Sequence, residues 1–408
     1  AQQRDTKERD AARMSRDSIK KAEFLKQIGN GYLPFNYFNL DLRYLVKFNQ
    51  FEGFRTGLGG ITNNRFSERY RINSYLVYGF KDKRYKYQIG GGFRVHKASN
   101  TWINLSYTDD LQETGSSKFL TDSRFFTFFE PRLLNIDLFH RHITKSIGLQ
   151  HKISNHLVSE IQLATSKINP TYNYTFVLDD QSFNTFDLST AILSLQWSPF
   201  SSFELVNDRL KETKNGYPKF ALQLTQSFKS VLGSDFNFTK LDFRTIQKFT
   251  HKNEASTNIT FVAGIAGGET PLTHLYHAYP NNITKETILQ RFSVAGLNSF
   301  ETMYFNEFFS DKFSTLQLKH FFRPFNISKR FKPQLVLISR YAVGNMRSIE
   351  RHQGIEFNTL EKLYSESGFE INKLIFGFGL SFAYRYGAYH LPNLEDNIAF
   401  KFTFNITL

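Results

Sequence analysis

The sequence of 408 residues has no cysteine, only three methionines and two tryptophans, and no long apolar run. Without cysteine, the chain cannot form disulfide bridges, thiolate zinc sites or a cysteine nucleophile. No stretch reaches the roughly 18 apolar residues that a membrane-spanning helix needs. If this chain crosses a membrane, it must therefore do so as strands of a closed barrel, because lipid offers no partner to unpaired backbone N–H and C=O groups.

Aromatic residues are abundant instead. With 45 Phe and 20 Tyr, aromatic residues make up 16% of the chain, although 22% of its residues are charged. This balance is typical of many strands that are apolar on one face only. A length of 408 residues would also suffice for two or three soluble domains, so the order of the residues has to decide.

The alternation of residues distinguishes these two possibilities. The chain ends in AFKFTFNITL, where apolar residues occupy every second position: Phe400, Phe402, Phe404, Ile406 and Leu408. Strict alternation is the period of a β-strand. In LIFGFGLSFAYRYG, residues 374–387, one face is bulky and the other is mostly small or charged. Lipid outside and a crowded lumen inside explain both faces, whereas the core of a soluble sandwich would need large residues from a second sheet.

Similar segments of about ten residues follow one another from Phe51 onward and are separated by turn residues. Each is long enough to cross the hydrocarbon layer at a tilt. The sequence predicts an all-β fold, a transmembrane antiparallel β-barrel of about 14 to 16 strands with 16 favoured, over residues 37–408. Residues 1–36 are polar and helix-forming and are predicted to be a short helix or tether, which Gly29, Gly31 and Pro34 end.

The positive charge does not indicate nucleic-acid binding. The net charge is +14, but the basic residues are scattered along the alternating segments, and the one dense run, residues 4–21, also contains acidic residues. No nucleic-acid-binding motif follows it. We expect the basic side chains to line a lumen or to meet the phosphates of outer-membrane lipid, the predicted lipid partner. The predicted location is the outer membrane of a Gram-negative bacterium.

No catalytic residue, metal site or cofactor is predicted. The glycine clusters GLGG and GGG lie within strand-like text and have no helix N-terminus behind them, so they do not form phosphate loops. His140 with His142, and His274 with His277, have ligand-like spacing but lack a third ligand. No serine lies in a nucleophile-elbow pattern. A lipid-modifying barrel enzyme with Ser and His on its outer face would escape this search and stays an alternative.

Charged residues inside the alternating segments indicate a polar lumen. They are Glu52, Arg55, Glu366, Glu370 and Arg385. Because charges facing hydrocarbon are costly, we expect these side chains to face inward and to form a buried network. Such a network could hold a lumenal loop or only stiffen the wall.

Several stretches in a fixed order resemble a known family. They are FNQFEGFRTGLGGITN, YLVYGFKDKRYKYQIGGGF, NSFETMYFNEFFSD, YSESGFEIN and YRYGAYHLPNLEDNIAFKF. From about Leu33 to Leu408 the chain resembles the C-terminal barrel of Bacteroidota outer-membrane proteins that carry an N-terminal carboxypeptidase-regulatory-like domain and have no assigned function. That barrel is distantly similar to the BamA, TamA and FhaC superfamily, whose sixteen-stranded barrels insert or translocate other proteins.

The resemblance implies a loop that returns into the lumen. TPLTHLY and then VAGLNSFETM occupy the place of that loop, and its candidate residues are Gly296, Asn298, Ser299, Phe300, Glu301 and Met303. The superfamily carries an arginine at the loop tip, and this stretch has none. We therefore expect Glu301 to meet Arg385 or Arg55, with the polarity reversed.

The resemblance also implies a role in the insertion, assembly or export of envelope proteins or lipids, as a subunit of a larger complex with other outer-membrane or periplasmic proteins. A weak seam is expected between a first strand at residues 51–62 and a last strand at residues 399–408. The seam residues are Phe51, Phe54, Leu58, Phe400, Phe402, Phe404, Ile406 and Leu408. The alternative is a passive pore or a structural scaffold of a surface complex.

Overall fold

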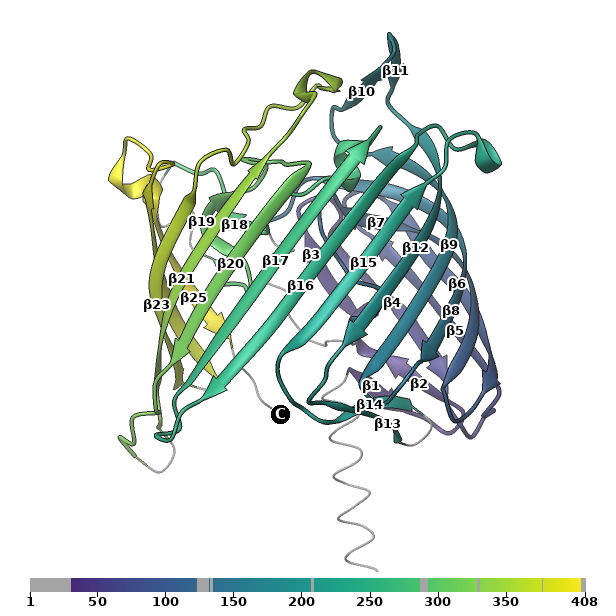
Figure 1. Cartoon of the computed structure of the whole chain (residues 1–408), viewed down its shortest axis with the longest axis horizontal. Helices are drawn as coiled ribbons and strands as arrows, with labels where there is room; N and C mark the ends of the chain where they lie inside the picture. Colours follow the sequence, from purple (N-terminus) through teal and green to yellow (C-terminus); the bar gives the residue numbers. More distant parts are fainter. Residues whose placement is uncertain are drawn as a thin grey trace, which may run out of the picture.

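The structure is a computed structural model, and it describes residues 31–122, 132, 135–206, 209–286, 293–328, 331–375 and 377–404. Most of the predicted tether of residues 1–36, namely residues 1–30, lies outside these ranges. No helix in the described part of the chain is long and apolar enough to cross a membrane. The main element is one antiparallel sheet of eighteen strands that curves around an interior (Figure 1).

Fifteen of these strands pair in succession along the sheet, each antiparallel to the next. They are β4 (Gly53–Thr62), β5 (Tyr70–Gly79), β6 (Arg84–His96), β7 (Thr101–Glu113), β8 (Phe139–Lys152), β9 (Leu157–Pro170), β12 (Phe186–Trp197), β15 (Lys219–Ser227), β16 (Phe238–Thr250), β17 (Ser256–Gly268), β20 (Lys312–Phe321), β21 (Gln334–Asn345), β23 (Tyr364–Ile375), β24 (Phe378–Gly387) and β25 (Ile398–Phe404).

The sheet begins with an interrupted strand. β2 (Phe38–Asp41) and β3 (Val46–Asn49) flank a 3₁₀ turn, η1 (Leu42–Tyr44), and both pair antiparallel with β4. A short strand, β1 (Tyr32–Pro34), pairs with the outer edge of β2. With β1 set aside and β2 and β3 counted as one interrupted strand, the described sheet has sixteen strands, within the predicted range of about 14 to 16. The predicted all-β, antiparallel barrel fold is confirmed.

Two predicted boundaries are corrected by this arrangement. Residues 51–62 are not the first strand, because β4 has neighbours on both edges: β5 on one, and β2 and β3 on the other. The segment 32–34, which the sequence places in the tether, belongs to the sheet. The division of the chain at residue 36 otherwise stays a prediction.

Tyr44 explains why the interrupted strand can dock on β4. Its ring stacks on Tyr75 with the centroids 4.2 Å apart. The ring also lies over Gly59, where an added Cβ would come within 2.4 Å of it. Covering a strand glycine with an aromatic ring restores the packing that the missing side chain would otherwise leave open.

The two faces of the strands differ as the alternation predicts. On β24, Gly379, Ser381, Ala383 and Arg385 are buried, while the bulky residues between them are partly exposed on the outer face. One detail differs from the sequence prediction. Residues 374–387 do not form one strand, because Gly377, with φ +85°, lies in the turn between β23 and β24.

The connections at the two ends of the barrel differ in length. At one end, here called the loop end, lie the longer connections and a small sheet of β10 (Thr175–Leu178), β11 (Gln181–Phe183) and β22 (His352–Gln353) (Figure 1). At the other end, the turn end, lies the hairpin of β13 (Ser202–Val206) and β14 (Arg209–Lys214) (Figure 1). Short 3₁₀ turns occur at η3 (Val231–Gly233), η4 (Leu272–His274), η5 (Ile349–Arg351) and η6 (Leu394–Asn397).

Candidate functional site: a lumenal plug beside an open seam

The connection between β17 and β20 returns into the barrel. It contains two short parallel strands, β18 (Pro280–Asn282) and β19 (Phe300–Tyr304), and β19 lies close to β24 and β25. We call the described residues of this connection, 269–286 and 293–311, the plug. β18 and most of β19 are buried. Of the predicted loop residues, Gly296, Ser299, Phe300, Glu301 and Met303 are buried and Asn298 is exposed.

The side chain of Glu366 on β23 binds backbone N–H groups of the plug. Its carboxylate accepts hydrogen bonds from the backbone N–H groups of Glu301 at 3.0 Å and Thr302 at 2.9 Å, and from the Thr302 hydroxyl at 2.6 Å. The guanidinium of Arg340, on neighbouring β21, lies 2.6 Å from the same carboxylate. A buried carboxylate needs this many donors, because burial without partners would destabilise its charged form.

Glu301 forms the second contact between the plug and the wall. Its carboxylate lies 3.1 Å from Lys401 Nζ on β25 and accepts hydrogen bonds from Asn281, Ser299 and the backbone of Gly296. Burial alone would raise the pKa of Glu301, but Lys401, Arg340 and these donors outweigh it and hold the pKa below its usual value. Glu301 is therefore charged at neutral pH.

The expected partner of Glu301 was wrong. Arg385 instead forms a bidentate ion pair with Glu307, which is also in the plug, with N–O distances of 2.7 and 3.1 Å. Its guanidinium also lies over the ring of Tyr364, 4.8 Å from the centroid. Arg55 is on β4 and pairs with Asp110. The position of each plug residue along the wall decides its partner: the Glu301 carboxylate lies beside Lys401 on β25, and Glu307 lies beside Arg385 on β24.

Glu370 belongs to the same region of the wall. It lies 3.5 Å from Lys319 Nζ on β20 and accepts a hydrogen bond from Asn372. Lys319 also donates to the backbone carbonyl of Leu297 in the plug at 2.8 Å. Four of the six predicted network residues, Glu301, Glu366, Glu370 and Arg385, thus lie around the plug.

The other two predicted network residues lie at a different part of the wall. Glu52 pairs with Lys86 at 2.6 Å and with Arg55 at 3.4 Å. Arg55 also makes a bidentate ion pair with Asp110, at 2.7 and 2.8 Å. This cluster joins the turn before β4 to β6 and β7, so its contacts stiffen the wall.

Glu113 and the described residue Arg132, in the connection after β7, also contact the plug. Glu113, at the end of β7, accepts a hydrogen bond from Arg132 at 2.6 Å and lies 2.7 Å from His277 Nε2. Burial lowers the pKa of His277, against the opposing effect of Glu113. Arg132 also donates to the backbone carbonyl of Pro280 at 3.0 Å. The plug is therefore held by the loop-end connections as well as by the wall.

The edge of β25 forms the seam. β24 pairs with one edge of β25, and none of the pairings found among the described residues joins the other edge to β1, β2 or β3, so the barrel is not closed. A plug segment, residues 293–295, instead pairs with this second edge in parallel. The Ala295 N–H donates to the Phe402 carbonyl at 2.7 Å, and the Phe402 N–H donates to the Ser293 carbonyl at 2.9 Å. We call these three residues the edge cap.

The predicted seam residues fall into three groups. Phe400 and Phe402 lie on β25 and are partly exposed on its outer face. Phe54 and Leu58 lie on β4 and Phe51 in the turn before it, and β2 and β3 separate them from the sheet edge. Ile406 and Leu408 lie outside the described residues, and only the backbone of Phe404 is described.

Sequence reasoning missed the partners that complete the network: Lys86, Asp110, Glu307, Lys319, Arg340 and Lys401. The position of Lys401 between Phe400 and Phe402 was a usable signal, because alternation places it inward. In the described part of the chain, no group of three or more His, Cys, Asp or Glu side chains that could hold a metal ion is found.

The comparisons with known proteins agree with this geometry. Residues 33–322 match the C-terminal domain of a family of unknown function, DUF5686. The chain belongs to this family. No curated protein matches its sequence. The Bacteroidota origin and the additional N-terminal domain stay predictions.

Solved structures show similarity to outer-membrane barrels. BamA from Haemophilus ducreyi, lacking POTRA domains 1–3, aligns with a TM-score of 0.52 at 10% identity, over 91% of this chain and 70% of BamA. CdiB from Acinetobacter baumannii aligns with a TM-score of 0.44 at 11% identity, and CdiB from Escherichia coli with 0.46 at 8%. These alignments cover 87% and 90% of this chain, and 57% and 62% of the two CdiB chains. At such identities, the BamA likeness supports the fold alone.

Proposed function

We propose that this chain is an outer-membrane barrel that assists the insertion, assembly or export of other envelope proteins, as a subunit of a larger complex and without enzymatic activity. The edge of β25 is the proposed working surface. A client strand would pair with it by main-chain hydrogen bonds, as in β-strand addition.

The observation that carries the proposal is the edge cap. The β25 edge already accepts a short extended segment of this chain, through the N–H and C=O groups of Phe402. Main-chain pairing depends little on side chains, so a strand from another protein can replace residues 293–295 without a sequence match. The plug argues in the same direction, since it is buried against β23, β24 and β25 and occupies part of the lumen, where a passive pore needs an open water path.

The test is a reversible disulfide that holds the edge cap against β25. Val294 and Phe402 are direct partners in the parallel bridge, and the chain has no native cysteine. The double variant Val294→Cys/Phe402→Cys would therefore form a single, defined disulfide. Cells depleted of the wild-type protein are complemented with this variant, and their outer-membrane proteome is measured under oxidising and reducing conditions.

We expect depletion to lower a set of outer-membrane proteins, the reduced variant to restore them, and the oxidised variant not to. The two single-cysteine variants are the matched controls and should restore the set under both conditions. Full restoration by the oxidised double variant would show that the edge of β25 need not be uncovered, and the proposal would be wrong.

A further inference from the structure

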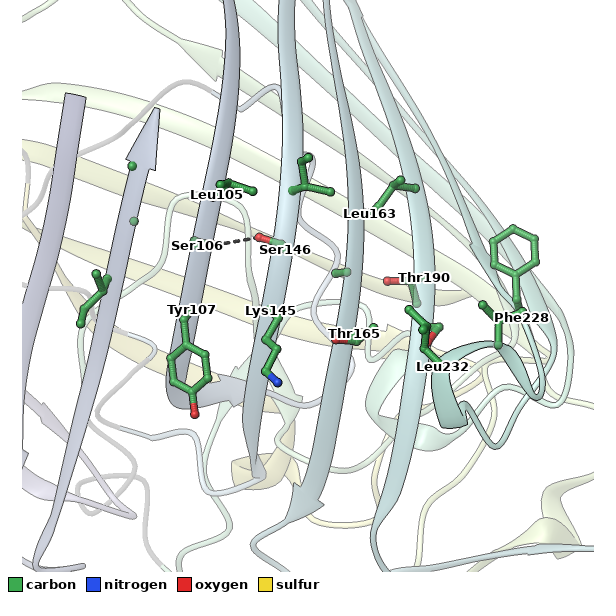
Figure 2. A pocket seen from close by; sticks show the side chains of 17 residues that line it. Leu105, Ser106, Tyr107, Lys145, Ser146, Leu163, Thr165, Thr190, Phe228 and Leu232 are labelled. Atoms are coloured by element: carbon green, nitrogen blue, oxygen red, sulfur yellow. Dashed lines mark hydrogen bonds between the residues drawn. The ribbon is translucent and has the colours of Figure 1, made fainter. Parts of the chain in front are cut away.

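The outer wall of the barrel carries a concave groove of about 760 Å³. Outward-facing residues of β6, β7, β8, β9 and β12 form its floor, and the connection between β15 and β16 forms a wall beside it (Figure 2). We call it the wall groove. Its volume lies within the roughly 300–1,000 Å³ that is usual for ligand sites.

Strand register sorts the floor into an apolar row and a polar row. Leu105, Ile147 and Leu163 are successive partners across β7, β8 and β9, and they are 60%, 46% and 52% exposed. Two residues nearer the loop end, the row begins with the apolar Ile89 on β6, which is 62% exposed. Its successive partners across β7, β8, β9 and β12 are polar: Tyr107, Lys145, Thr165 and Ser189. Figure 2 shows Lys145 and Tyr107 extending to the same side, away from Leu105 and Leu163.

Two polar groups of the wall groove lack partners. No hydrogen bond or ion pair of the Lys145 ammonium is found among the described residues, although the side chain is exposed on the outer face. Ser189 is only 4% exposed, and its hydroxyl has no hydrogen-bond partner in the described structure. A lysine on a lipid-facing wall is costly unless an anion neutralises it.

The wall beside the groove is built by Phe228, Val231 and Leu232. The backbone of Leu232 is in the left-handed region, with φ +50°, and its side chain is 81% exposed. The Phe228 N–H donates to the carbonyl of Ser189 at 3.0 Å, which fixes this connection to β12. A strained backbone that exposes a leucine beside an apolar floor favours contact with an acyl chain.

We propose that the wall groove binds lipid A, the phosphorylated glycolipid of the outer leaflet. An acyl chain lies on Leu105, Ile147 and Leu163, and a phosphate meets Lys145. The groove's polar side faces the loop end, and outer-membrane barrels carry their longer loops on the outside, so the phosphate depth of the outer leaflet fits this row. The inference rests on the proposed outer-membrane location but not on the seam.

The experiment is native mass spectrometry of the full chain in detergent, titrated with lipid A and, separately, with phosphatidylglycerol. We expect saturable binding of one lipid A and much weaker binding of phosphatidylglycerol. Lys145→Gln should weaken lipid A binding about fivefold, corresponding to the roughly 1 kcal/mol that a lysine near a lipid surface contributes. Lys145→Arg should bind like the wild type.

Two further variants distinguish lipid binding in the wall groove from attraction by the net charge of the protein. Lys167 lies on the same face of β9, two residues from Thr165 and opposite Asp187, so Lys167→Gln removes an equal charge outside the groove. It should leave lipid A binding unchanged. Gly91 lines the groove, and an added Cβ there would meet only the Arg71 carbonyl, at 3.7 Å. Gly91→Leu should therefore fill the floor and weaken binding with every lysine in place.

Heat-shifted gel migration shows that each variant is folded before it is titrated. Equal binding of both lipids would mean an unselective lipid-facing surface, and equal losses in Lys145→Gln and Lys167→Gln would mean attraction by net charge alone. Either result would overturn the proposal. The lipid titration does not involve β25, so absence of lipid A binding would not contradict the proposed function of the seam. Likewise, full restoration by the oxidised disulfide variant would not contradict lipid binding in the wall groove.

Discussion

The carboxylate of Glu366 lies 2.6 Å from the guanidinium of Arg340, and both side chains are almost completely buried. The same carboxylate accepts the backbone N–H groups of Glu301 and Thr302. One ion pair thus links two neighbouring strands of the wall to the plug. Its strength should decide how firmly the plug is held.

Replacement of Glu366 should be strongly destabilising. Glu366→Gln leaves the charge of Arg340 buried without its counter-ion, which typically costs about 3–5 kcal/mol. The measurement is the temperature at which the purified barrel loses its folded migration on a gel. The control is Glu68→Gln, because Glu68 pairs with Lys97 at 2.9 Å with both side chains 58% exposed. Such a surface pair contributes about 0–1 kcal/mol, so equal shifts in the two variants would contradict the assignment.

The pair of Glu301 and Lys401 should control access to the lumen. We expect Glu301→Lys and Lys401→Glu each to loosen the plug through repulsion between like charges and to raise single-channel conductance. The double variant should restore part of the low conductance, because the attraction returns with its polarity reversed.

The comparison is the charge swap between Glu301 and Arg385, which are not partners in this structure. That double variant should show no restoration. Restoration there, or steady wild-type conductance like that of a porin, would contradict the plug geometry described above and would favour the passive-pore alternative.

The Glu301 contact should also respond to pH. Since its pKa in the folded chain is below the usual value of 4.5, its contribution to stability is complete above that value and is lost as the pH falls through the folded pKa. We expect low conductance down to about pH 5 and a rise in more acidic buffer. In Glu301→Gln this acid-induced rise in conductance should be smaller. A rise of equal size would mean that another titrating group causes it.

Gly59 should be necessary for docking of the interrupted first strand. An added Cβ would lie 2.4 Å from the Tyr44 ring and 2.6 Å from Tyr75 Cβ, so Gly59→Ala should displace Tyr44. Hydrogen exchange in residues 38–49 should then become faster. Gly148→Ala is the control, because its nearest contact would be 3.5 Å away. Unchanged exchange in Gly59→Ala would contradict the packing role of Tyr44.

The alternation of side chains made the barrel predictable. It identified the outer and inner faces of β24 and β25, because successive side chains point to opposite sides of a sheet. It could not locate the turn at Gly377, since Phe376 and Phe378 continue the same alternation on both sides of it. It also missed the first strand, because η1 divides that strand into two segments of four residues.

The partners in the lumen could not be predicted in the same way. Alternation shows that a side chain such as Arg385 points inward, but the strand it faces depends on the register and on the path of the plug. The edge cap had no sequence signal at all. Residues 293–295 pair through backbone groups, which every residue other than proline carries.

The most direct measurement of whether client strands pair with the edge of β25 is photo-crosslinking from this edge in living cells. A benzophenone side chain is placed at Phe402, next to the edge cap, and at Phe243 on β16 as a control. Strand exchange at this edge predicts covalent adducts between position 402 and other outer-membrane proteins, and none from position 243. Adducts from position 402 to lipid or to this chain alone would contradict it.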